Sequence, residues 1–449
     1  MKVFFVSLGC DKNLIDSEHM LGSLSKEGYT ITDNEEEADV IIVNSCCFID
    51  SAKEESIGTI LEMAKYKTEG NCKALIVAGC MAQRYKEEVL QEIPEVDAIL
   101  GTTAYDAIAE VVKEAMGGQT PVRMDDLSEL PGEHSKRILT TGGFYEYLKI
   151  AEGCNKNCAY CVIPSVRGPY RSVPMEKVLG EARELADQGV EELILVAQET
   201  TRYGVDLYGT KMLHILLKDL CEIPGIRWIR ILYCYPEEIY PEMVRVMKEE
   251  PKICHYLDLP IQHCSDTVLK RMGRYTNKIE LTERIAYLRK EIPDIALRTT
   301  LITGFPGETE EEHREMLDFI KEIRFDRLGV FTYSQEEGTR AAEMPDQIPE
   351  EIKLDRRDAL MAAQQEISTM RGRNLIGKTL EVFVEGFAGE EDAYIGRTYA
   401  DAPGVDGYFF ISTDQTLHSG DFVRSKVTGA MEYDLIGEFL EEDEDESAE

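Results

Sequence analysis

Short apolar runs alternate with longer amphipathic stretches along the first part of the chain. Each run has the length of a buried strand, and each stretch between runs has room for a helix. The runs cover Val3–Leu8, Val40–Val43, Ala74–Ala78 and Ala98–Leu100. Strands that alternate with helices in this way form parallel sheets with helices on both faces. Residues 1–116 are therefore predicted to form a doubly wound α/β domain, in which Asp16 or Ser17 caps the first helix.

A second series of strands and helices begins after a stretch rich in glycine, proline and charge. Residues 117–143 have no sustained hydrophobic period, so we interpret them as a linker. Residues 144–370 then contain six apolar runs, at Tyr145–Ala151, Glu192–Ala197, Arg227–Tyr233, His255–Pro260, Ile295–Thr303 and Arg327–Thr332. Six such units suit an open relative of the eight-unit α/β barrel, whose chemistry lies at the carboxyl ends of its strands. An amphipathic helix over Glu350–Met370 is expected to lead out of it.

The last portion of the chain changes to short strands separated by turn signals. Within residues 371–440 these strands are predicted at Thr379–Glu385, Ala393–Tyr399, Gly407–Ser412 and Phe422–Gly429. This pattern is typical of a small antiparallel barrel. Residues 441–449 form an acidic tail, for which we expect a solvated segment without a catalytic role.

Composition narrows the classes of function. The chain has 449 residues, of which 43% are hydrophobic, and a net charge of -36 from 85 acidic and 49 basic residues. Such a charge repels phosphate backbones and attracts basic partners, so direct nucleic-acid readout is not expected. The sequence contains no apolar run of about 18 residues and no export signal, which indicates a cytoplasmic protein without a membrane partner. In that compartment the twelve cysteines are expected to stay reduced.

Three of these cysteines form a compact motif after the first strand of the predicted partial barrel. Cys154, Cys158 and Cys161 are spaced Cys-x3-Cys-x2-Cys. Three thiolates on a 4Fe-4S cluster leave one iron open, where S-adenosylmethionine can bind and accept an electron. The alternative is structural zinc, which normally needs a fourth ligand, and the motif has none nearby. Tyr160 is a candidate for packing beside the cofactor or, equally, a core aromatic residue.

A second triad emerges only from the strand pattern. Cys10, Cys46 and Cys80 each follow an apolar strand of the first domain directly. Parallel strands end at one edge of a sheet, so the three thiols are expected to meet there and to bind a second cluster. The alternative is three buried core cysteines, which is a common environment for this residue type.

Other sequence features carry weaker signals. The turn that follows the fifth strand of the partial barrel contains Gly304 and Gly307, where a cofactor could lie against the backbone, although the lysine of a P-loop is absent. Gln198–Thr200 and Gln262–His263 also end strands of the partial barrel and could contact cofactor or substrate. For His263 a structural hydrogen bond is an equal alternative. The six remaining cysteines have no mutual metal spacing, and we assign them to core or surface thiols.

Together these motifs resemble the radical S-adenosylmethionine methylthiotransferases over nearly the whole chain. The resemblance rests on both cysteine triads and on the terminal barrel, which is similar to a TRAM domain. Its closest likeness is to the RimO branch, through the segments Gly9–Asn13, Glu152–Asn155, Ile163–Gly168, Gln262–His263 and Asp401–Gly407. Cys47 and Cys264 depart from that pattern, since relatives often carry glycine there, and their roles stay open.

The resemblance implies a specific activity. The RimO branch attaches a methylthio group to the β-carbon of an aspartate in small-subunit ribosomal protein twelve. It implies two 4Fe-4S clusters, one on Cys154, Cys158 and Cys161 and an auxiliary one on the Cys10 triad, together with S-adenosyl-L-methionine and an electron donor such as flavodoxin or ferredoxin. The resemblance leaves catalytic residues beyond the cluster ligands unknown.

Two alternatives to this activity remain open. A sister branch of the family methylthiolates isopentenylated adenosine in transfer RNA and has a more basic terminal barrel. Residues 371–440 contain twelve acidic and six basic residues, which favours a basic protein substrate over RNA. The other alternative is a noncatalytic iron-sulfur protein, which would hold clusters without cleaving S-adenosylmethionine.

Overall fold

Parallel strands and helices alternate through the first part of the chain in the computed structural model, which describes residues 1–132 and 136–441. Six strands form one parallel sheet in the order β2-β1-β3-β4-β5-β6. The strands are β1 Lys2–Ser7, β2 Thr30–Ile31, β3 Val40–Ser45, β4 Ala74–Ala78, β5 Ala98–Leu100 and β6 Val122–Arg123. The helices are α1 Asp11–Lys26, α2 Asp50–Ala64, α3 Tyr66–Glu69, α4 Gly79–Tyr85, α5 Glu87–Glu92 and α6 Ile108–Met116.

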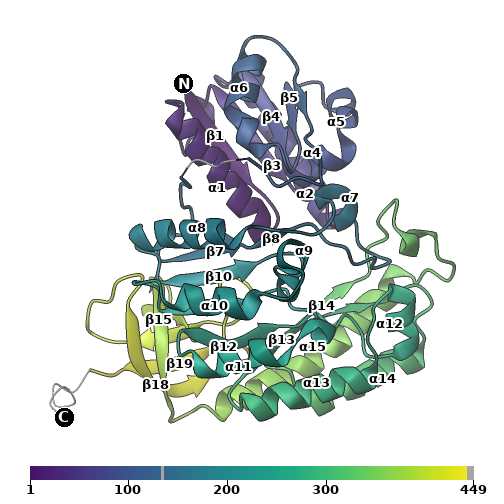
Figure 1. The fold of residues 1–449 in the computed structure, drawn as a ribbon, viewed down its shortest axis with the longest axis vertical. Coiled ribbons are helices and arrows are strands. Elements are labelled where there is room, and N and C mark those ends of the chain that lie inside the picture. Colours follow the sequence, from purple (N-terminus) through teal and green to yellow (C-terminus); the bar gives the residue numbers. More distant parts are fainter. Residues whose placement is uncertain (133–135, 442–449) are drawn as a thin grey trace. The chain divides into compact units, whose positions relative to one another are not determined.

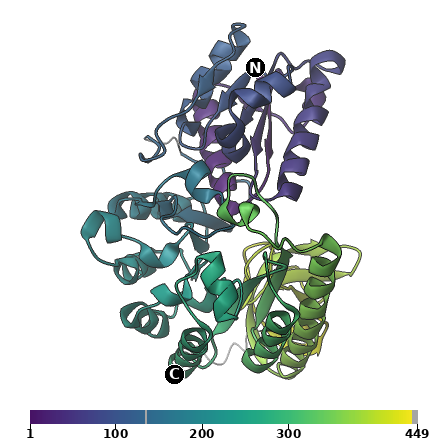
Figure 2. The ribbon, with the colours of Figure 1, turned by 90° about the vertical axis from the view of Figure 1, so that its right-hand side faces the viewer.

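Alternating residues of the central strands build a core on each face of this sheet. Val40 and Ile42 pack with apolar residues of α1 and α6. Ile41 and Val43 point to the opposite face, where they pack with residues of α2, α4 and α5. Side chains along a strand alternate between faces, and a sheet buried on both sides therefore reads as a continuous apolar run. Figure 2 shows helices on both faces of the purple sheet, which confirms the predicted doubly wound arrangement.

The start of the first helix corrects one prediction. α1 begins at Asp11, with Cys10 as its N-cap residue in an extended conformation. Asp16 and Ser17 lie inside the helix and are buried, so neither caps it. The prediction was wrong because Asp16 is held by a buried partner, Lys149, whose Nζ lies 2.5 Å from its carboxylate. Two short strands, β2 and β6, also escaped prediction, and β6 lies within the segment that we interpreted as a linker.

The six strands predicted for the middle of the chain form one sheet, as expected. Its order is β14-β13-β12-β11-β10-β7, and β11 to β14 pair in parallel. The strands are β7 Tyr145–Lys149, β10 Glu192–Val196, β11 Trp228–Ile231, β12 Ile253–Asp258, β13 Ala296–Thr303 and β14 Arg327–Thr332, and a separate two-stranded ladder joins β8 Ala151–Glu152 to β9 Arg171–Ser172. The helices of this region are α7 Ile163–Arg167, α8 Met175–Asp187, α9 Val205–Tyr208, α10 Leu213–Cys221, α11 Pro241–Glu249, α12 Asp266–Met272, α13 Lys278–Glu291, α14 Glu310–Ile323 and α15 Glu350–Arg373.

A closed five-stranded barrel ends the described chain, drawn in yellow and yellow-green in Figure 1. Its strands are β15 Thr379–Ala388, β16 Ala393–Arg397, β17 Phe409–Ser412, β18 Phe422–Ala430 and β19 Leu435–Phe439. The first four match the predicted strands. The fifth, β19, was missed, and it closes the barrel by pairing in parallel with β17 and antiparallel with β18. The acidic tail beyond residue 441 lies outside the described residues.

Contacts among the described residues divide the chain into two compact units. The first comprises Met1–Glu184, Leu195–Met212 and Ser334–Glu343. The second comprises Leu185–Ile194, Leu213–Tyr333 and the chain from Met344 onward. Both cysteine triads lie in the first unit, and the terminal barrel lies in the second. Across the described part of the chain, no helix combines the length and the apolar character needed to cross a membrane.

Candidate functional site

The first three candidate cysteines follow neighbouring strands of the first sheet. Cys10 lies between β1 and α1, Cys46 directly follows β3, and Cys80 is the second residue of α4, after β4. Because β1, β3 and β4 are adjacent and parallel, their carboxyl ends share one edge of the sheet. A Cβ atom placed on Gly9 would lie 2.7 Å from Cβ and 3.0 Å from Sγ of Cys46. The structure thus brings the three cysteine loops together.

Two glycines beside these cysteines adopt backbone conformations that other residues avoid. Gly9 precedes Cys10 with φ of +91°, and Gly79 precedes Cys80 with φ of +89°. A Cβ atom on Gly79 would lie 2.2 Å from Oδ1 of Asn44, so a side chain is excluded by space as well as by φ. These glycines let the loops pack closely, and three thiols at one sheet edge are the donor set of a 4Fe-4S cluster with one open iron. The residues present therefore fit such a group.

Two buried asparagines brace the loops that carry this triad. Asn13 Nδ2 donates hydrogen bonds to the carbonyl oxygens of Leu8 and Ser45, both at 3.0 Å. Asn44 Nδ2 donates to the carbonyl oxygen of Asn13 at 2.8 Å. The thiol of Cys80 in turn donates to Asn13 Oδ1, with 3.7 Å between the two atoms. One amide side chain, that of Asn13, therefore contacts all three cysteine-bearing segments.

The thiols of this triad differ in exposure. Cys46 and Cys80 are buried, whereas Cys10 is exposed. Burial raises the pKa of Cys80 to about 12, and the positive charge of Arg167 acts in the opposite direction. Cluster ligands are thiolates, so iron binding at these residues would release protons. The metal-free thiol of Cys80 is expected to be neutral at physiological pH.

The second triad lies on a loop between β8 and α7. Gly153 has φ of +71°, and a Cβ atom on it would lie 2.1 Å from the carbonyl oxygen of Pro169. The backbone N–H of Cys154 donates to the Gly168 carbonyl at 3.1 Å, which fixes the start of the loop. The N–H of Cys161 donates to the carbonyl of Cys158 at 3.2 Å, which folds its end into a turn. The spacing of the motif is thus realised as one tight loop.

This loop supplies three thiols, the donor set of a 4Fe-4S cluster with one open iron. Cys154 and Cys158 are buried and Cys161 is half-buried, and burial raises the pKa of Cys154 to about 11. Among the described residues, no three Cys, His, Asp or Glu side chains converge on one metal ion.

A segment far along the chain contacts the loops that carry both triads. We call Ser334–Glu343 the strap. Its Ala341 N–H donates to the carbonyl of Ala159 at 2.8 Å, within the second cysteine loop. Its buried Glu336 pairs with Lys53 of α2 and Arg84 of α4, each at 3.1 Å. Helix α2 follows Cys46, and helix α4 contains Cys80. The strap therefore connects the two triads within the first unit.

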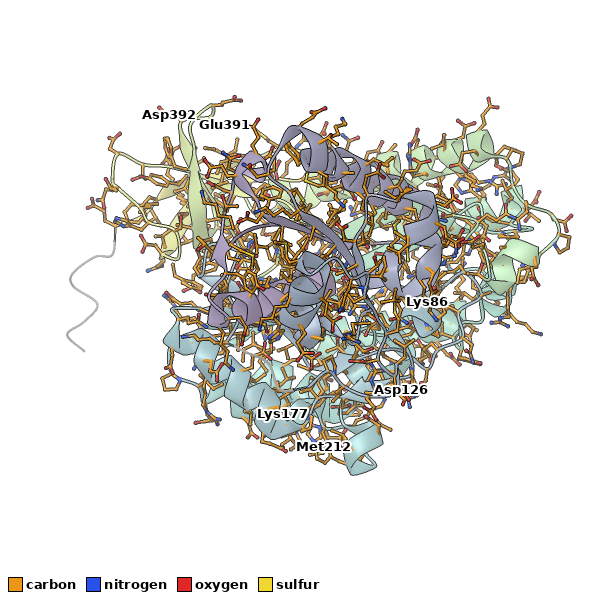
Figure 3. The ribbon with its side chains drawn as sticks, turned by 90° about the horizontal axis from the view of Figure 1, so that it is seen from above. Lys86, Asp126, Lys177, Met212, Glu391 and Asp392 are labelled. Carbon is orange, nitrogen blue, oxygen red and sulfur yellow. The ribbon has the colours of Figure 1, made fainter. Side chains whose placement is uncertain are left out.

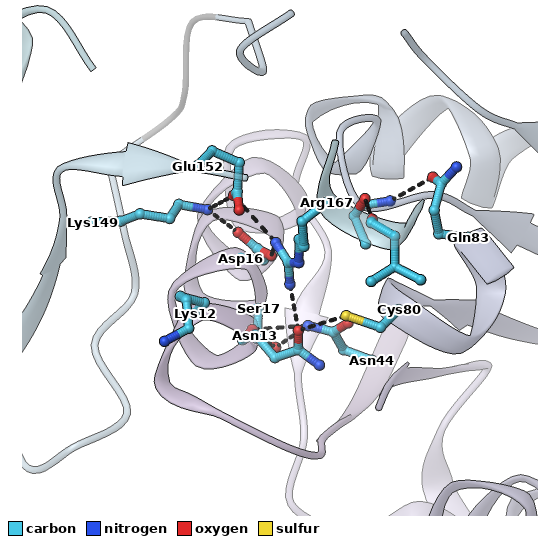
Figure 4. Close-up of polar contacts among 12 residues, drawn as sticks. Lys12, Asn13, Asp16, Ser17, Asn44, Cys80, Gln83, Lys149, Glu152 and Arg167 are labelled. Carbon is cyan, nitrogen blue, oxygen red and sulfur yellow. Dashed lines mark hydrogen bonds and ion pairs between the residues drawn. The ribbon is translucent and has the colours of Figure 1, made fainter. Parts of the chain in front are cut away.

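A buried polar network forms a second connection (Figure 4). The guanidinium of Arg167 donates to Oδ1 of Asn13, and it pairs with Asp16 at 2.7 Å and Glu152 at 3.2 Å. Lys149 pairs with the same carboxylates, at 2.5 Å for Asp16 and 2.9 Å for Glu152. Glu152 lies two residues before Cys154, and Asn13 contacts Cys80. The network therefore runs from one cysteine triad to the other.

The two glycines predicted to contact a cofactor have backbone N–H groups that already bind protein acceptors. The Gly304 N–H donates to the carboxylate of Glu308 at 2.5 Å, and the Gly307 N–H donates to the Asp346 carbonyl at 2.9 Å. Both glycines have positive φ, near +72° and +73°, so the turn itself requires them. Their proposed cofactor role stays a prediction, and so does that of Tyr160, which is half-buried.

The other strand-end residues fall into different settings. Gln198 Nε2 donates to Glu152 at 3.0 Å, which places it at the polar network beside the second triad. His263 is fully buried, and its Nδ1 accepts a hydrogen bond from the Ser265 N–H at 2.9 Å. The structural alternative for His263 is therefore realised. Gln262 adopts φ of +69°, and its N–H and carbonyl bond to β13.

The two cysteines with open roles are core residues. Cys47 is fully buried in the apolar core under α2, and burial raises its thiol pKa to about 11. Cys264 is also fully buried, with a thiol pKa raised to about 12 by burial. Both thiols are therefore protonated and shielded in the absence of metal.

Sequence reasoning missed the residues that connect the triads. Asn13, Arg167 and Glu152 stand inside segments that carry the family resemblance, and this was the available signal. The sequence contains no such signal for Glu336 and Lys53, because a charged residue that will be buried looks the same in a sequence as one that will be exposed. Their pairing depends on contacts between segments more than 250 residues apart, as for Arg84 and Glu336, which are separated by 252 positions.

Comparison with known families agrees with this architecture. Residues 2–101 match the uncharacterized protein family UPF0004, residues 148–320 match the radical SAM superfamily, and residues 376–440 match the TRAM domain. Among solved structures, the radical S-adenosylmethionine methyltransferase TsrM from Kitasatospora setae is similar with a TM-score of 0.52 at 15% identity, over 74% of each chain. That likeness concerns the fold alone. The class of this protein is thus a radical SAM protein with a terminal TRAM barrel.

Full-length relatives define the family more narrowly. The ribosomal protein uS12 methylthiotransferase RimO of Lachnoclostridium phytofermentans is 60% identical over 97% of this chain and 99% of its own length. The RimO proteins of Pelotomaculum thermopropionicum and Clostridioides difficile are 52% and 48% identical, each over 98% of this chain and 99% of the relative. The chain belongs to the RimO family of methylthiotransferases.

Proposed function

We propose that this protein attaches a methylthio group to the β-carbon of an aspartate in ribosomal protein uS12. The observation that carries the proposal is the 60% identity, over nearly the full length of both chains, to a relative named for that substrate. The cofactors are two 4Fe-4S clusters and S-adenosyl-L-methionine. The enzyme works in the cytoplasm with flavodoxin or ferredoxin as its electron donor.

The six cysteines divide the cofactor binding between two loops. Cys154, Cys158 and Cys161 would hold the cluster that binds S-adenosylmethionine, and the triad of Cys10, Cys46 and Cys80 would hold the auxiliary cluster. When bound, these groups supply one-electron and sulfur-transfer chemistry that amino-acid side chains lack. With three protein ligands each, both clusters keep one iron accessible to small molecules.

The protein scaffold supplies position and exclusion of water. Gly9, Gly79 and Gly153 let the cysteine loops pack closely against neighbouring segments, because any Cβ there would meet a neighbouring atom within 2.1–2.7 Å. The strap and the Arg167 network hold the two loops within one unit. A reactive carbon can react with sulfur only if both are held close and quenching groups are kept away. These contacts provide that constraint.

The terminal barrel suits a basic protein partner. Its acidic residues outnumber its basic ones by twelve to six over residues 371–440. Figure 3 shows Glu391 and Asp392 projecting at the tip of the turn between β15 and β16, where both are exposed. Ribosomal proteins are rich in lysine and arginine, so attraction to this surface would speed encounter and weaken as salt rises. The proposed domains are 1–116, 144–370 and 371–440.

The decisive experiment is an anaerobic assay on the reconstituted full-length chain. The enzyme, S-adenosylmethionine and a reductant are incubated with uS12, and the product is digested and analysed by peptide mass spectrometry. We expect a methylthio adduct on one aspartate and release of 5'-deoxyadenosine. A Cys154→Ala variant, with the auxiliary triad intact, is the matched control and is expected to release none.

Parallel incubations separate the alternatives. Product on isopentenylated transfer RNA, with none on uS12, would identify the sister activity. Clusters that bind stably without any 5'-deoxyadenosine release would identify a noncatalytic iron-sulfur protein. Either result would overturn the proposal.

A further inference from the structure

The short segment Ile163–Gly168 contacts the loops of both cysteine triads. Val166 packs in the apolar core beneath Cys80, and its carbonyl accepts a hydrogen bond from Thr102 Oγ1 at 2.7 Å, at the end of β5. Two residues later, the Gly168 carbonyl accepts from the Cys154 N–H at 3.1 Å. The backbone of this segment therefore joins the first sheet to the second cysteine loop, and Arg167 is the residue between these two contacts.

The side chain of Arg167 repeats that connection. It is only 2% exposed, and its three partners come from two segments: Asn13 and Asp16 from α1, and Glu152 from β8. As Figure 4 shows, the guanidinium points between Asp16 and Asn13, and Asn13 in turn faces Cys80. A planar fork with several donors can satisfy such divergent acceptors, whereas a lysine ammonium cannot do so with the same geometry.

The positive and negative charges of this network are equal in number, but its two cations contact different groups. Two carboxylates, Asp16 and Glu152, face two cations, Lys149 and Arg167. Arg167 donates to Oδ1 of Asn13, and the same oxygen accepts from the Cys80 thiol. Lys149 instead contacts the ring of Tyr105, at 5.3 Å from its centroid. Of these two cations, Arg167 is thus the one whose partner contacts a thiol of the first triad.

We propose that Arg167 is a positioning residue that sets the reduction potential of the auxiliary cluster and fixes the Asn13 amide against the Cys80 thiol. This inference rests on the proposed function, because it requires a cluster on Cys10, Cys46 and Cys80. A cluster with three thiolate ligands carries negative charge, and reduction adds one more negative charge to it. A buried cation favours the reduced state, since charge interactions are strong where water is excluded.

The test isolates the auxiliary cluster in the full-length chain. Cys154, Cys158 and Cys161 are replaced by alanine, the protein is reconstituted anaerobically, and the cluster is titrated with reductant and followed by electron paramagnetic resonance. In this background Arg167→Gln is expected to lower the ratio of reduced to oxidised cluster about tenfold at a fixed potential, which is about 59 mV for a one-electron couple. Arg167→Lys keeps the charge and is expected to retain most of the parent potential while broadening the spectrum.

Two further variants separate this role from folding. The double change Arg167→Gln with Glu152→Gln keeps the buried network neutral, and we expect a smaller fall in potential because the loss of the carboxylate offsets part of the loss of the cation. Arg137→Gln removes an equally buried arginine of the same unit, whose partners are Glu146 at 2.9 Å and Glu181 at 2.8 Å, together with Glu18. That variant is expected to lose thermal stability and to keep the parent potential.

The outcomes discriminate between the inference and its premise. If the parent binds a cluster and both Arg167 variants to glutamine keep its potential, the assignment to Arg167 is wrong. The assignment is also wrong if Arg137→Gln shifts the potential as far. If the parent binds no iron, the ligand assignment of the proposed function fails instead, and the inference fails with it.

Discussion

Two buried arginine networks, one in each unit, use the same chemistry for different ends. In the first unit Arg167 and Lys149 face Asp16 and Glu152 beside the cysteine triads. In the second unit Arg397 of β16 donates to Glu192 at 2.7 Å, and Arg230 of β11 donates to the same carboxylate at 2.7 Å. Glu192, Arg230 and Arg397 are fully buried.

The second network joins the terminal barrel to the neighbouring sheet. Arg230 also donates to the Tyr399 carbonyl at 2.6 Å, and the rings of Trp228, Phe383 and Phe422 pack against one another nearby. The thiol of Cys254 lies beside Arg230; burial raises its pKa to about 12, while the charge of Arg230 opposes the shift. A single thiol offers no cluster site. Its arginines therefore dock one domain on another, whereas Arg167 also reaches an amide that contacts a triad thiol.

The comparison teaches that burial of charge does not by itself indicate function. A buried ion pair adds little net stability over an apolar pair, but removing one partner leaves an uncompensated charge and costs about 3–5 kcal/mol. Both networks share that cost. What distinguishes the first is the chemistry of the groups that its charges face.

The largest expected effect comes from removing a cysteine triad. Replacing Cys10, Cys46 and Cys80 together with alanine should halve the bound iron and abolish methylthio product, because the auxiliary cluster loses all its ligands. Iron analysis and peptide mass spectrometry measure both. Cys47→Ala is the matched control, since its thiol lies in the core. Unchanged iron and full product in the triple variant would contradict the cluster assignment.

The second prediction tests the docking role of Arg397. Arg397→Met should lower the free energy of unfolding by about 3–5 kcal/mol, because Glu192 and Glu385 lose a buried counter-charge. Urea denaturation measures the change. Arg227→Met removes a half-exposed ion pair with Glu381 and should cost about 1 kcal/mol or less. Equal costs would show that the buried network contributes nothing beyond a surface pair.

A smaller effect is expected at the strap. Glu336→Gln removes the carboxylate that pairs with Lys53 and Arg84, and it should cost about 1–3 kcal/mol. It should also speed the loss of iron to a chelator, because the strap holds the second cysteine loop. Glu343→Gln is the control, since that side chain of the strap is exposed. Identical rates of iron release from both variants would show that Glu336 and the strap do not stabilise the second cysteine loop.

The smallest expected effect is on the stability of the protein in acid, through the buried, uncharged side chain of His263 in the second unit. Burial lowers the pKa of His263 to about 3, with His313, Arg271 and Arg356 adding to the shift. The unfolded chain takes up this proton near pH 6.5 and the folded chain does not, so stability falls as pH drops below 6.5. His263 should contribute about 1.4 kcal/mol per pH unit between pH 6 and 5.

The pH dependence of unfolding in His263→Asn checks that contribution. In this variant the free energy of unfolding should fall less steeply as the pH drops from 6 to 5. His418→Asn changes a histidine whose side chain is 78% exposed and should leave the slope intact. An identical slope in both variants would show that His263 takes up its proton as readily in the folded protein as in the unfolded chain.

Local sequence patterns determined most of the architecture. Apolar runs of strand length predicted the central strands of both sheets, because residues buried on both faces must be apolar. The spacing of Cys154, Cys158 and Cys161 and the strand ends at Cys10, Cys46 and Cys80 identified the candidate ligands. Strands of two residues, such as β2 and β6, carry no period and escaped detection. β19 escaped because its apolar residues gave too short a pattern before the acidic tail.

Only the tertiary structure decided which side chains connect the cysteine loops to each other. Arg167 and Asn13 are 154 positions apart, and no local rule pairs an arginine with a particular amide at that separation. The same holds for Glu336 with Lys53 and Arg84. Side-chain period and motif spacing are properties of neighbouring residues, and a sequence displays them directly. Salt bridges across a folded core depend on strand order and on which helix covers which face, and these are set only when the whole chain packs.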